Sequence, residues 1–199
     1  MAEQQKGGLY KSMSIAVIVP THNEPNTHLV IGQISTAIGL EGNISVFNDT
    51  EGRGKGFALR EALKGVTADY YIFIDGDGDI DPRQIGPILY FLKEGVDVVV
   101  GKKQLPVRWD RKILTYASRI WIKLLFGITV DSQTGLKGFN YKPEWKRNGW
   151  AFDVEILWKA KLAGKSMREV PIHATVSSGK SIKDILSTLI DTIKIRVGL

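Results

Sequence analysis

The sequence has no cysteine, which excludes disulfide bonds and thiolate zinc sites and fits a reducing cytoplasm. No apolar run approaches the roughly 20 residues that a membrane-spanning helix requires. The first twelve residues are polar and lack the apolar core of a signal peptide, so we expect residues 1–12 to form a flexible tail. Acidic residues are scarcer than basic ones, 21 against 27, and the formal net charge of +6 favours either an anionic partner or simply a soluble surface.

A composition of 43% hydrophobic and 24% charged residues over 199 positions is that of a globular protein with a substantial core. Strand-like and helix-like segments alternate through the first half of the chain. Buried strands are expected at 15–20, 43–49, 70–75 and 96–101, and helices at 27–39, 54–65 and 82–94. This alternation predicts an α/β fold with a mainly parallel sheet flanked by helices.

The second half is richer in helices. Helices are predicted at 111–126, 153–164 and 181–199, and the last of them begins with a capping box and carries an amphipathic apolar face over 181–197. The segment 131–140 is rich in turn residues before it becomes extended, and a strand is expected at 167–176. Because the chain contains no repeat, linker or low-complexity segment, we expect residues 13–199 to form a single domain.

Ligands of parallel sheets bind beyond the C-terminal ends of the strands. Four polar segments follow the expected strands and should share one rim: Thr21–Glu24, Asn48–Lys55, Asp75–Asp81 and Gly101–Lys103. The glycine-rich piece GRGKG (52–56) offers backbone N–H groups and a cation where a helix starts, which suits a phosphate. It does not match the P-loop pattern, however, and taken alone it is better explained as an ordinary glycine-rich turn.

The stretch IDGDGDIDP (74–82) carries four aspartates, at positions 75, 77, 79 and 81, directly after an apolar run. Neighbouring carboxylates repel one another, so their concentration here calls for a counter-charge. Asp75 and Asp77 can point to the same side and suit a hard divalent cation, Mg2+ or Mn2+, which would hold the diphosphate of a nucleotide. A solvated acidic turn is the alternative, whereas an EF-hand would need a glutamate near position 86, where Gly86 stands.

Five motifs, in this order, resemble those of family 2 glycosyltransferases with the GT-A fold, and in particular the dolichol-phosphate mannose synthases and polyprenyl-phosphate glycosyltransferases. They are VIVPTHNE (17–24), GRGKGFALREAL (52–63), IFIDGDGDIDP (72–82), the helix 110–127 followed by VDSQTGLKGF (130–139), and FDVEILWKAKLAGKSMREVPI (152–172). Each motif is weak or moderate by itself, and their common order is the specific signal. The resemblance extends from about Ile15 to Ser181.

The resemblance implies roles for individual positions of this chain. The residues that match donor-nucleotide positions are Pro20, Thr21, Glu24, Asp49, Lys55, Asp75 and Gly76, and those that match the metal site are Asp75 and Asp77. The positions that would contact the acceptor phosphate are Arg111, Ser118, Arg119 and Lys123, with Arg111 counted beside Asp75 and Asp77 as catalytic. Three further carboxylates, Asp131, Asp153 and Glu155, are candidate general bases or loop organisers.

One strand-helix unit of the family pattern is missing. Asn48, Asp49 and Thr50 run almost directly into GRGKG, where the family has a longer aspartate-rich segment, another helix and another strand. We therefore expect a smaller sheet than is usual for the fold. Base specificity stays open, because the usual second aspartate is replaced by Asn48 or absent.

The reaction that the resemblance implies is a metal-dependent, inverting transfer of a hexose from a GDP-mannose- or UDP-glucose-type donor to a polyprenyl or dolichyl phosphate. A lipid phosphate is already an anion near pH 7 and needs no general base, and the basic residues between 102 and 123 would bind it and the anionic headgroups around it. Such an enzyme would lie peripherally on the cytoplasmic face of a membrane.

Other functions explain the sequence less completely. A hydroxyl acceptor would require a base, for which Asp153 and Glu155 are candidates. The missing unit leaves open an inactive nucleotide-binding domain. A sugar nucleotidyltransferase should carry a G-x-G-T-R-type loop after its first strand, where this chain has PTHNE. We expect no nucleic-acid partner, because no motif of that class is present and the basic residues adjoin an acidic rim.

Overall fold

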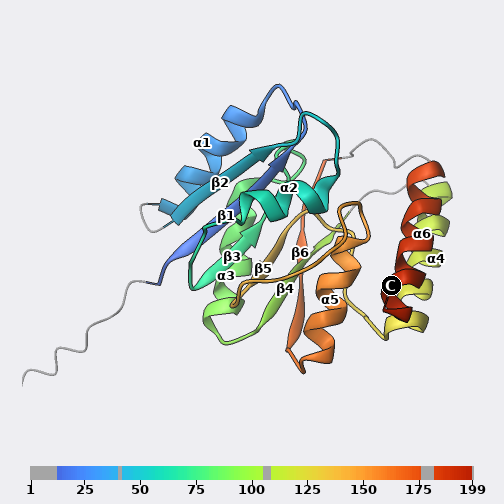
Figure 1. Cartoon of the computed structure of the whole chain (residues 1–199). Coiled ribbons are helices and arrows are strands. Elements are labelled where there is room, and N and C mark those ends of the chain that lie inside the picture. The colour runs from blue at the N-terminus through green and yellow to red at the C-terminus, as the bar shows by residue number, and fades with distance from the viewer. Residues whose placement is uncertain (1–12, 40–41, 105–108, 176–181, 199) are drawn as a thin grey trace, which may run out of the picture.

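The computed structural model describes residues 13–39, 42–104, 109–175 and 182–198, except for the side chains of 109–115 and 182–186. At its centre is a six-stranded sheet with the order β2-β1-β3-β5-β4-β6 (Figure 1). The strands are β1 (Ile15–Thr21), β2 (Gly42–Asn48), β3 (Tyr70–Phe73), β4 (Val98–Lys103), β5 (Lys137–Phe139) and β6 (Met167–Ile172). Among the described strands, β5 alone runs antiparallel to its neighbours, so the prediction of a mainly parallel α/β sheet is confirmed.

Six α-helices are described around this sheet: α1 (Thr27–Ile38), α2 (Lys55–Ala62), α3 (Ile85–Lys93), α4 (Trp109–Phe126), α5 (Phe152–Leu162) and α6 (Ile182–Val197). All lie within a few residues of their predicted positions. The helix expected from residue 82 differs at its start, where a single 3-10 turn, η2 (Pro82–Gln84), precedes α3. Pro82 stands in the first turn and the Asp81 side chain accepts the Arg83 N–H, which fixes this entry.

Strands β1, β3 and β5 and most of β4 are buried on both faces, whereas the edge strand β2 is only partly buried. Consecutive side chains of a strand point to opposite sides of the sheet. In β1, Ala16 and Ile18 belong to one apolar cluster, which includes residues of α2, α4 and α5. The alternate residues Ile15, Val17 and Val19 belong to a second cluster with residues of α1 and α3. The uninterrupted apolar runs of the sequence thus become the middle of a three-layer α/β/α arrangement (Figure 1).

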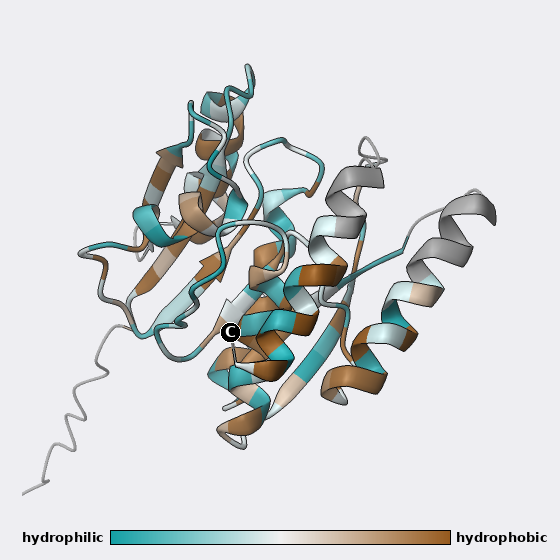
Figure 2. Ribbon diagram, turned by 45° about the vertical axis from the view of Figure 1, so that its right-hand side comes forward, coloured by the Kyte–Doolittle hydropathy of each residue, from teal (hydrophilic) through white to brown (hydrophobic). Residues whose placement is uncertain are grey.

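Helices α4 and α6 lie side by side at one end of the sheet (Figure 1). The Trp121 indole N–H of α4 donates to the Thr192 hydroxyl of α6 at 3.0 Å, and the Arg196 guanidinium of α6 donates to the Leu125 carbonyl at 3.0 Å. Both helices carry hydrophobic and hydrophilic residues in alternation along their described turns (Figure 2). Within the described ranges, no helix is long and apolar enough to cross a membrane.

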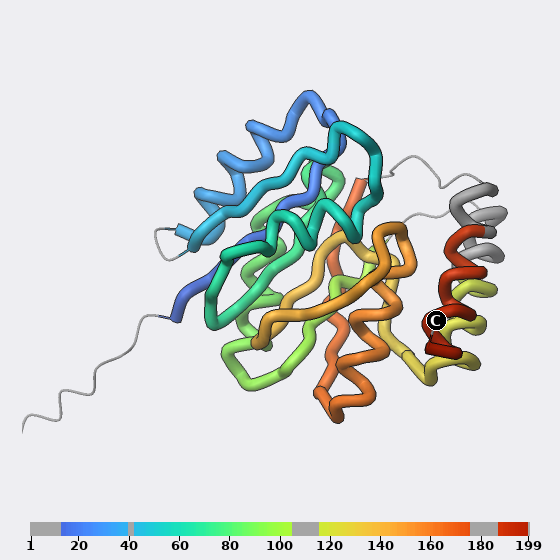
Figure 3. The backbone as a smooth tube through the Cα atoms, in the orientation of Figure 1, coloured from blue at the N-terminus to red at the C-terminus, as the bar shows by residue number. Residues whose placement is uncertain are grey.

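The chain passes from β2 into α2 through residues 49–54 (Figure 3). This short passage is the place where the sequence lacks the strand-helix unit of the family pattern. It brings the end of β2 and the start of α2 to the C-terminal ends of β1 and β3, as expected of a ligand-binding rim in a parallel sheet. The predicted tail, residues 1–12, lies outside the described residues.

Candidate functional site

The end of β1 and the end of β2 are joined by a small polar network. The Asn48 amide oxygen accepts the Thr21 hydroxyl at 3.3 Å and the Asn23 N–H at 2.9 Å, and its amide nitrogen donates to Asn23 at 3.2 Å. The His22 ring nitrogen Nδ1 lies 2.5 Å from the Asp49 carbonyl and is the donor in this contact. The Glu24 carboxylate folds back to accept the His22 N–H. These polar groups crowd the rim at the end of β1, as the sequence predicted.

Asp49 holds the loop that leads into α2. Its buried carboxylate accepts the Gly54 N–H at 2.9 Å and pairs with the Arg53 guanidinium at 3.1 Å. Burial alone would raise the pKa of Asp49, but the bonds from Gly54 and Arg53 outweigh it and lower the pKa. The resemblance implied a nucleotide-binding role for Asp49, whereas both carboxylate oxygens are engaged within the loop itself.

Asp75 emerges from the end of β3 directly beside Lys55 at the start of α2. Its Oδ1 lies 2.6 Å from the Lys55 ammonium. Burial would lower the pKa of Lys55, but the charges of Asp75 and then Asp153 raise it, so the lysine is a stable cation. The next residue, Gly76, packs on Thr21, where an added Cβ would lie 2.5 Å from the threonine methyl carbon. The structure therefore brings Thr21, Lys55 and Asp75 together at one rim.

The four aspartates of the acidic stretch have different surroundings. Asp77 is at the surface and accepts the Asp79 N–H at 3.0 Å, and partial desolvation together with the charges of Asp75 and Asp79 raises its pKa. Asp79 accepts the Thr175 hydroxyl at 3.0 Å and so ties the stretch to the segment after β6. Asp81 pairs with Arg83 and caps η2. Asp79 and Asp81 therefore help to shape the loop, whereas Asp75 pairs with Lys55 and Asp77 is exposed.

The pair Asp75 and Asp77 fits a divalent cation that is completed by a substrate. Within the described residues, no group of three or more histidine, cysteine, aspartate or glutamate side chains is arranged to hold a metal by itself. Magnesium is commonly bound by one or two carboxylates plus phosphate oxygens and water. Partial burial first, and then the charges of Asp75 and Asp79, raise the pKa of Asp77, and a bound cation would favour its ionised form.

A buried ion pair lies close behind the rim. The Lys137 ammonium of β5 lies 2.7 Å from the Asp153 carboxylate of α5, and it also donates to the Thr134 carbonyl. Lys137 is 1% exposed, and burial lowers its pKa against the opposite effect of Asp153. The nearby charge of Lys55 also lowers the pKa of Lys137, whereas that of Asp75 raises it. Asp153 is therefore a partner of Lys137 rather than a free base.

A pocket of about 300 Å³ lies between α4 and the segment 128–133. Its lining includes three of the residues expected to meet an acceptor phosphate, Ser118, Arg119 and Lys123, together with Asp131. We name it the acceptor pocket, after the role that the resemblance implies for these residues. Arg111 belongs to α4, but its side chain lies outside the described residues.

A smaller pocket of about 30 Å³ adjoins the acceptor pocket and shares Ser118, Ser132 and Gln133 with it. Its lining also includes Asp153 and Trp150. The Trp150 ring centre lies 5.6 Å from the Lys55 ammonium. A continuous set of residues therefore leads from the acceptor pocket to the Lys55–Asp75 pair.

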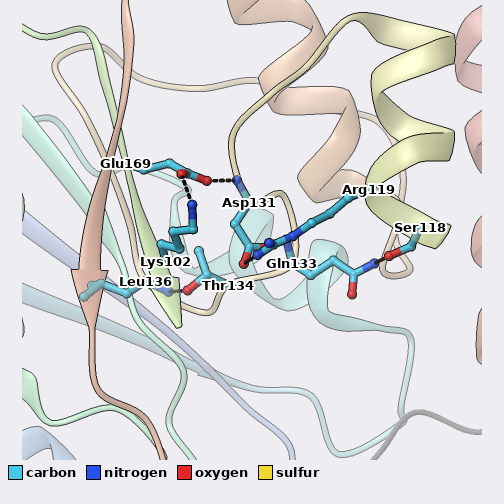
Figure 4. A network of polar contacts seen from close by, with 8 residues as sticks. All are labelled: Lys102, Ser118, Arg119, Asp131, Gln133, Thr134, Leu136 and Glu169. Carbon is cyan, nitrogen blue, oxygen red and sulfur yellow. Dashed lines mark hydrogen bonds and ion pairs between the residues drawn. The ribbon is translucent and has the colours of Figure 1, made fainter. Parts of the chain in front are cut away.

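Asp131 is at the centre of a polar network that Figure 4 shows. One carboxylate oxygen lies 2.7 Å from the Arg119 guanidinium and the other accepts the Gln133 N–H at 3.0 Å. The Asp131 N–H in turn donates to Glu169 of β6 at 2.7 Å, and Glu169 also pairs with Lys102 of β4 at 2.8 Å. Of the two roles suggested for Asp131, these contacts favour the loop organiser.

Glu155 organises a different loop. Its carboxylate accepts the backbone N–H groups of Lys146 and Arg147 at 2.9–3.0 Å and pairs with Lys159 at 2.9 Å. Burial would raise the pKa of Glu155, but these bonds outweigh it and lower the pKa. The same loop carries Trp150, so Glu155 supports the rim through this loop. Its contacts do not place it as a general base.

Sequence reasoning overlooked two charged residues of the site, Lys137 and Glu169. Both stand inside quoted motifs, Lys137 in VDSQTGLKGF and Glu169 in SMREVPI. An isolated charge in a strand is most simply interpreted as solvent-facing, which conceals its role. The signal that could have revealed their roles was their position within these motifs, because the apolar pattern around each residue does not explain a charged side chain there.

Comparison with known proteins gives consistent relatives. The sequence model described as Glycosyl transferase family 2 matches residues 24–141. The dolichyl-phosphate beta-glucosyltransferase of Dictyostelium discoideum is 27% identical over 207 residues, which cover 94% of this chain and 62% of that protein. The polyprenol monophosphomannose synthase of Mycolicibacterium smegmatis is 23% identical over 202 residues, with 80% of this chain and 76% of that protein covered.

Solved structures give the same fold. The glucosyl-3-phosphoglycerate synthase of Mycobacterium tuberculosis, crystallised with Mn2+, uridine diphosphate and phosphoglyceric acid, superposes with a TM-score of 0.72 at 19% identity. The match covers 94% of this chain and 79% of that one. A second crystal structure of that enzyme, with Mn2+, uridine-diphosphate-glucose and phosphoglyceric acid, gives a TM-score of 0.71 at 18% identity.

Proposed function

Because the chain belongs to glycosyl transferase family 2 and has the GT-A fold, we propose that it moves a hexose from a nucleotide-diphosphate sugar to a polyprenyl or dolichyl phosphate. The observation that carries this proposal is the acceptor pocket, where the cationic side chains of Arg119 and Lys123 stand beside Ser118. The residues of this pocket continue to the Lys55–Asp75 pair through Trp150. A phosphate acceptor and a diphosphate donor can therefore meet between them.

In this proposal the donor diphosphate binds at the rim formed by Thr21, Lys55 and Asp75. Lys55 remains protonated there, because carboxylates raise its pKa despite burial, and it offers a fixed positive charge to a departing diphosphate. Asp75 and Asp77 would hold a divalent cation, which when bound would supply Lewis-acid stabilisation to the same leaving group. The polar end of β1, with Thr21 and Glu24, would hold the nucleoside.

The acceptor phosphate is placed against Arg119, which forms charge-assisted hydrogen bonds to a phosphate readily. In the free protein this guanidinium is paired with Asp131 at 2.7 Å, so a phosphate has to compete with that carboxylate. A phosphate oxygen near neutral pH is already a nucleophile and requires no proton acceptor on the protein. The contacts of the candidate bases agree with this, because Asp153 is paired with Lys137 and Glu155 with backbone N–H groups.

The donor part of the proposal is tested by a thermal-shift panel of UDP, GDP and their glucose and mannose derivatives, each with and without Mn2+. We expect one nucleotide series to raise the melting temperature, and to do so only when Mn2+ is present, because binding to the folded state stabilises it. The two bases are compared in the same plate, since base specificity is open. The absence of a Mn2+-dependent shift with every compound would contradict the proposed function.

The membrane is the proposed partner surface for this enzyme. Six large apolar side chains are exposed on α4 and α6, at helical spacing along each helix: Tyr116, Ile120, Leu124, Ile190, Ile193 and Val197. The same two helices carry exposed cations, Arg119, Lys123 and Lys194. Apolar side chains with flanking cations are typical of surfaces that bind anionic membranes. We propose peripheral association through this face.

Substitution of Leu124 tests the membrane surface. Leu124 is 78% exposed, and its transfer from water into the interface contributes about 1.5–3 kcal/mol if fully buried. Leu124→Glu should therefore weaken co-sedimentation with phosphatidylglycerol vesicles by about tenfold or more. Leu162→Glu is the matched control, because Leu162 is similarly exposed but lies at the end of α5. Equal loss of binding in both variants would argue against a defined membrane face.

A further inference from the structure

The loop of residues 131–135 separates the acceptor pocket from the donor carboxylates. Its first three residues line the acceptor pocket. Its last residue, Gly135, packs directly on Asp75, where an added Cβ would lie 2.1 Å from the carboxylate oxygen Oδ2. The loop is thus one wall of the acceptor pocket and a support of the donor site at the same time.

Glu169 holds the first end of this loop to the sheet. Its two carboxylate oxygens are divided between two partners, the Asp131 N–H at 2.7 Å and the Lys102 ammonium at 2.8 Å (Figure 4). Strands β4 and β6 are paired along their whole lengths, so Lys102 and Glu169 stand on a rigid base. The anchored residue, Asp131, is the one that also pairs with Arg119.

Lys137 holds the other end of the loop. Its ammonium donates to the Thr134 carbonyl and lies 2.7 Å from Asp153. Lys137 is paired in register with Phe73 of β3, shortly before Asp75, and with Val100 of β4. A buried ion pair of this kind seldom improves stability over an apolar pair of the same size, because desolvation offsets the attraction. Because this ion pair lies next to Asp75, we expect it to order the loop rather than to stabilise the fold.

We infer that Glu169 and Lys137 are positioning residues that hold the loop 131–135 as a rigid bridge, through which the acceptor pocket and the donor carboxylate Asp75 keep one common geometry. This inference rests on the proposed function, because the proposed function assigns the two ends of the bridge to acceptor and donor. Glu169 contacts the loop at Asp131, and the effect expected at Asp75 is transmitted through Gln133, Thr134 and Gly135. Loss of the Glu169 anchor should therefore be measurable at the donor end.

The test measures donor-site binding after the acceptor end is loosened. Titration calorimetry with UDP and GDP in the presence of Mn2+ is carried out on the full chain and on the variants Glu169→Ala, Glu169→Gln and Lys102→Met. We expect Glu169→Ala to raise the dissociation constant of the bound nucleotide by about tenfold, as for a lost hydrogen bond to a charged group. Glu169→Gln should raise this dissociation constant only about threefold, because the glutamine amide oxygen still accepts the Asp131 N–H. Lys102→Met should resemble Glu169→Gln, because it removes the ion pair alone.

The matched control is Glu61→Ala, which breaks a glutamate–lysine pair of 2.7 Å on α2, away from this loop, and should leave nucleotide binding unchanged. All measurements are made at a temperature where circular dichroism shows every variant folded, so that lost stability does not lower affinity. If Glu169→Ala does not fold, the milder variants still give the answer. Donor binding equal to wild type in Glu169→Gln and Lys102→Met, or in a folded Glu169→Ala, would overturn the bridge. Absent nucleotide binding by the wild type would instead overturn the proposed function.

Discussion

The variant Asp77→Ala is expected to lower sugar transfer by about 100- to 1000-fold, because Lewis-acid stabilisation of a leaving group contributes several kcal/mol to the transition state. Asp77 is exposed, and with Asp75 it is the residue that we propose as a ligand of the cation. Its one described hydrogen bond is to the N–H of Asp79, two residues on, and its raised pKa reflects partial desolvation and the neighbouring charges. Mn2+-dependent binding of the nucleotide should be lost together with activity, and titration calorimetry measures that loss separately from turnover.

The matched control comes from the same acidic stretch. Asp81 is a half-exposed aspartate that pairs with Arg83 and caps the 3-10 turn before α3. Asp81→Ala should cost roughly 1 kcal/mol of stability, as for the loss of a helix cap, and leave Mn2+ binding unchanged. If Asp77→Ala and Asp81→Ala affect nucleotide binding equally, the acidic stretch acts as a diffuse field of charge and no defined metal site exists there.

The central strands and the order of the helices could be predicted from the sequence because their signals are local. Continuous apolar runs such as IAVIVP identify strands that are buried on both faces, and this pattern needs no knowledge of the partners. Strand β5 was harder to predict, because its three residues, Lys137–Phe139, include a lysine and a glycine. Its place between β3 and β4 depends on pairing partners that are distant in the chain.

The site was predicted unevenly, for a related reason. The proximity of Lys55 and Asp75 follows from the rule that strand ends share a rim, and the structure joins them at 2.6 Å. The partners of Asp131 could not be derived in the same way. Asp131 meets Arg119 and Glu169, which lie 12 and 38 residues away along the chain on a helix and a strand. A carboxylate is a candidate base or an organiser depending on such contacts, and sequence spacing does not specify them.

The variant Arg119→Ala is expected to raise the Michaelis constant for a short polyprenyl phosphate, such as farnesyl phosphate, by about 10- to 100-fold, as for one lost charge-assisted hydrogen bond. Removal of the guanidinium also leaves the Asp131 carboxylate in the acceptor pocket without its partner at 2.7 Å, which adds repulsion to the lost attraction. Steady-state kinetics with varied acceptor gives the Michaelis constant, and calorimetry with Mn2+ and the nucleotide gives donor affinity. The acceptor constant should change far more than the donor affinity.

Two comparisons separate recognition of the phosphate from the effect of charge alone. Arg119→Lys keeps the charge but loses the planar pair of donors, and it should recover part of the acceptor affinity. Arg168→Ala removes the same charge from β6, where the guanidinium lies 3.9 Å from the centre of the Phe91 ring, so it should leave both substrates unaffected. Equal weakening of donor and acceptor by Arg119→Ala would place Arg119 outside the acceptor site. Equal effects of Arg119→Ala and Arg168→Ala would mean that overall positive charge, and not this pocket, attracts the lipid phosphate.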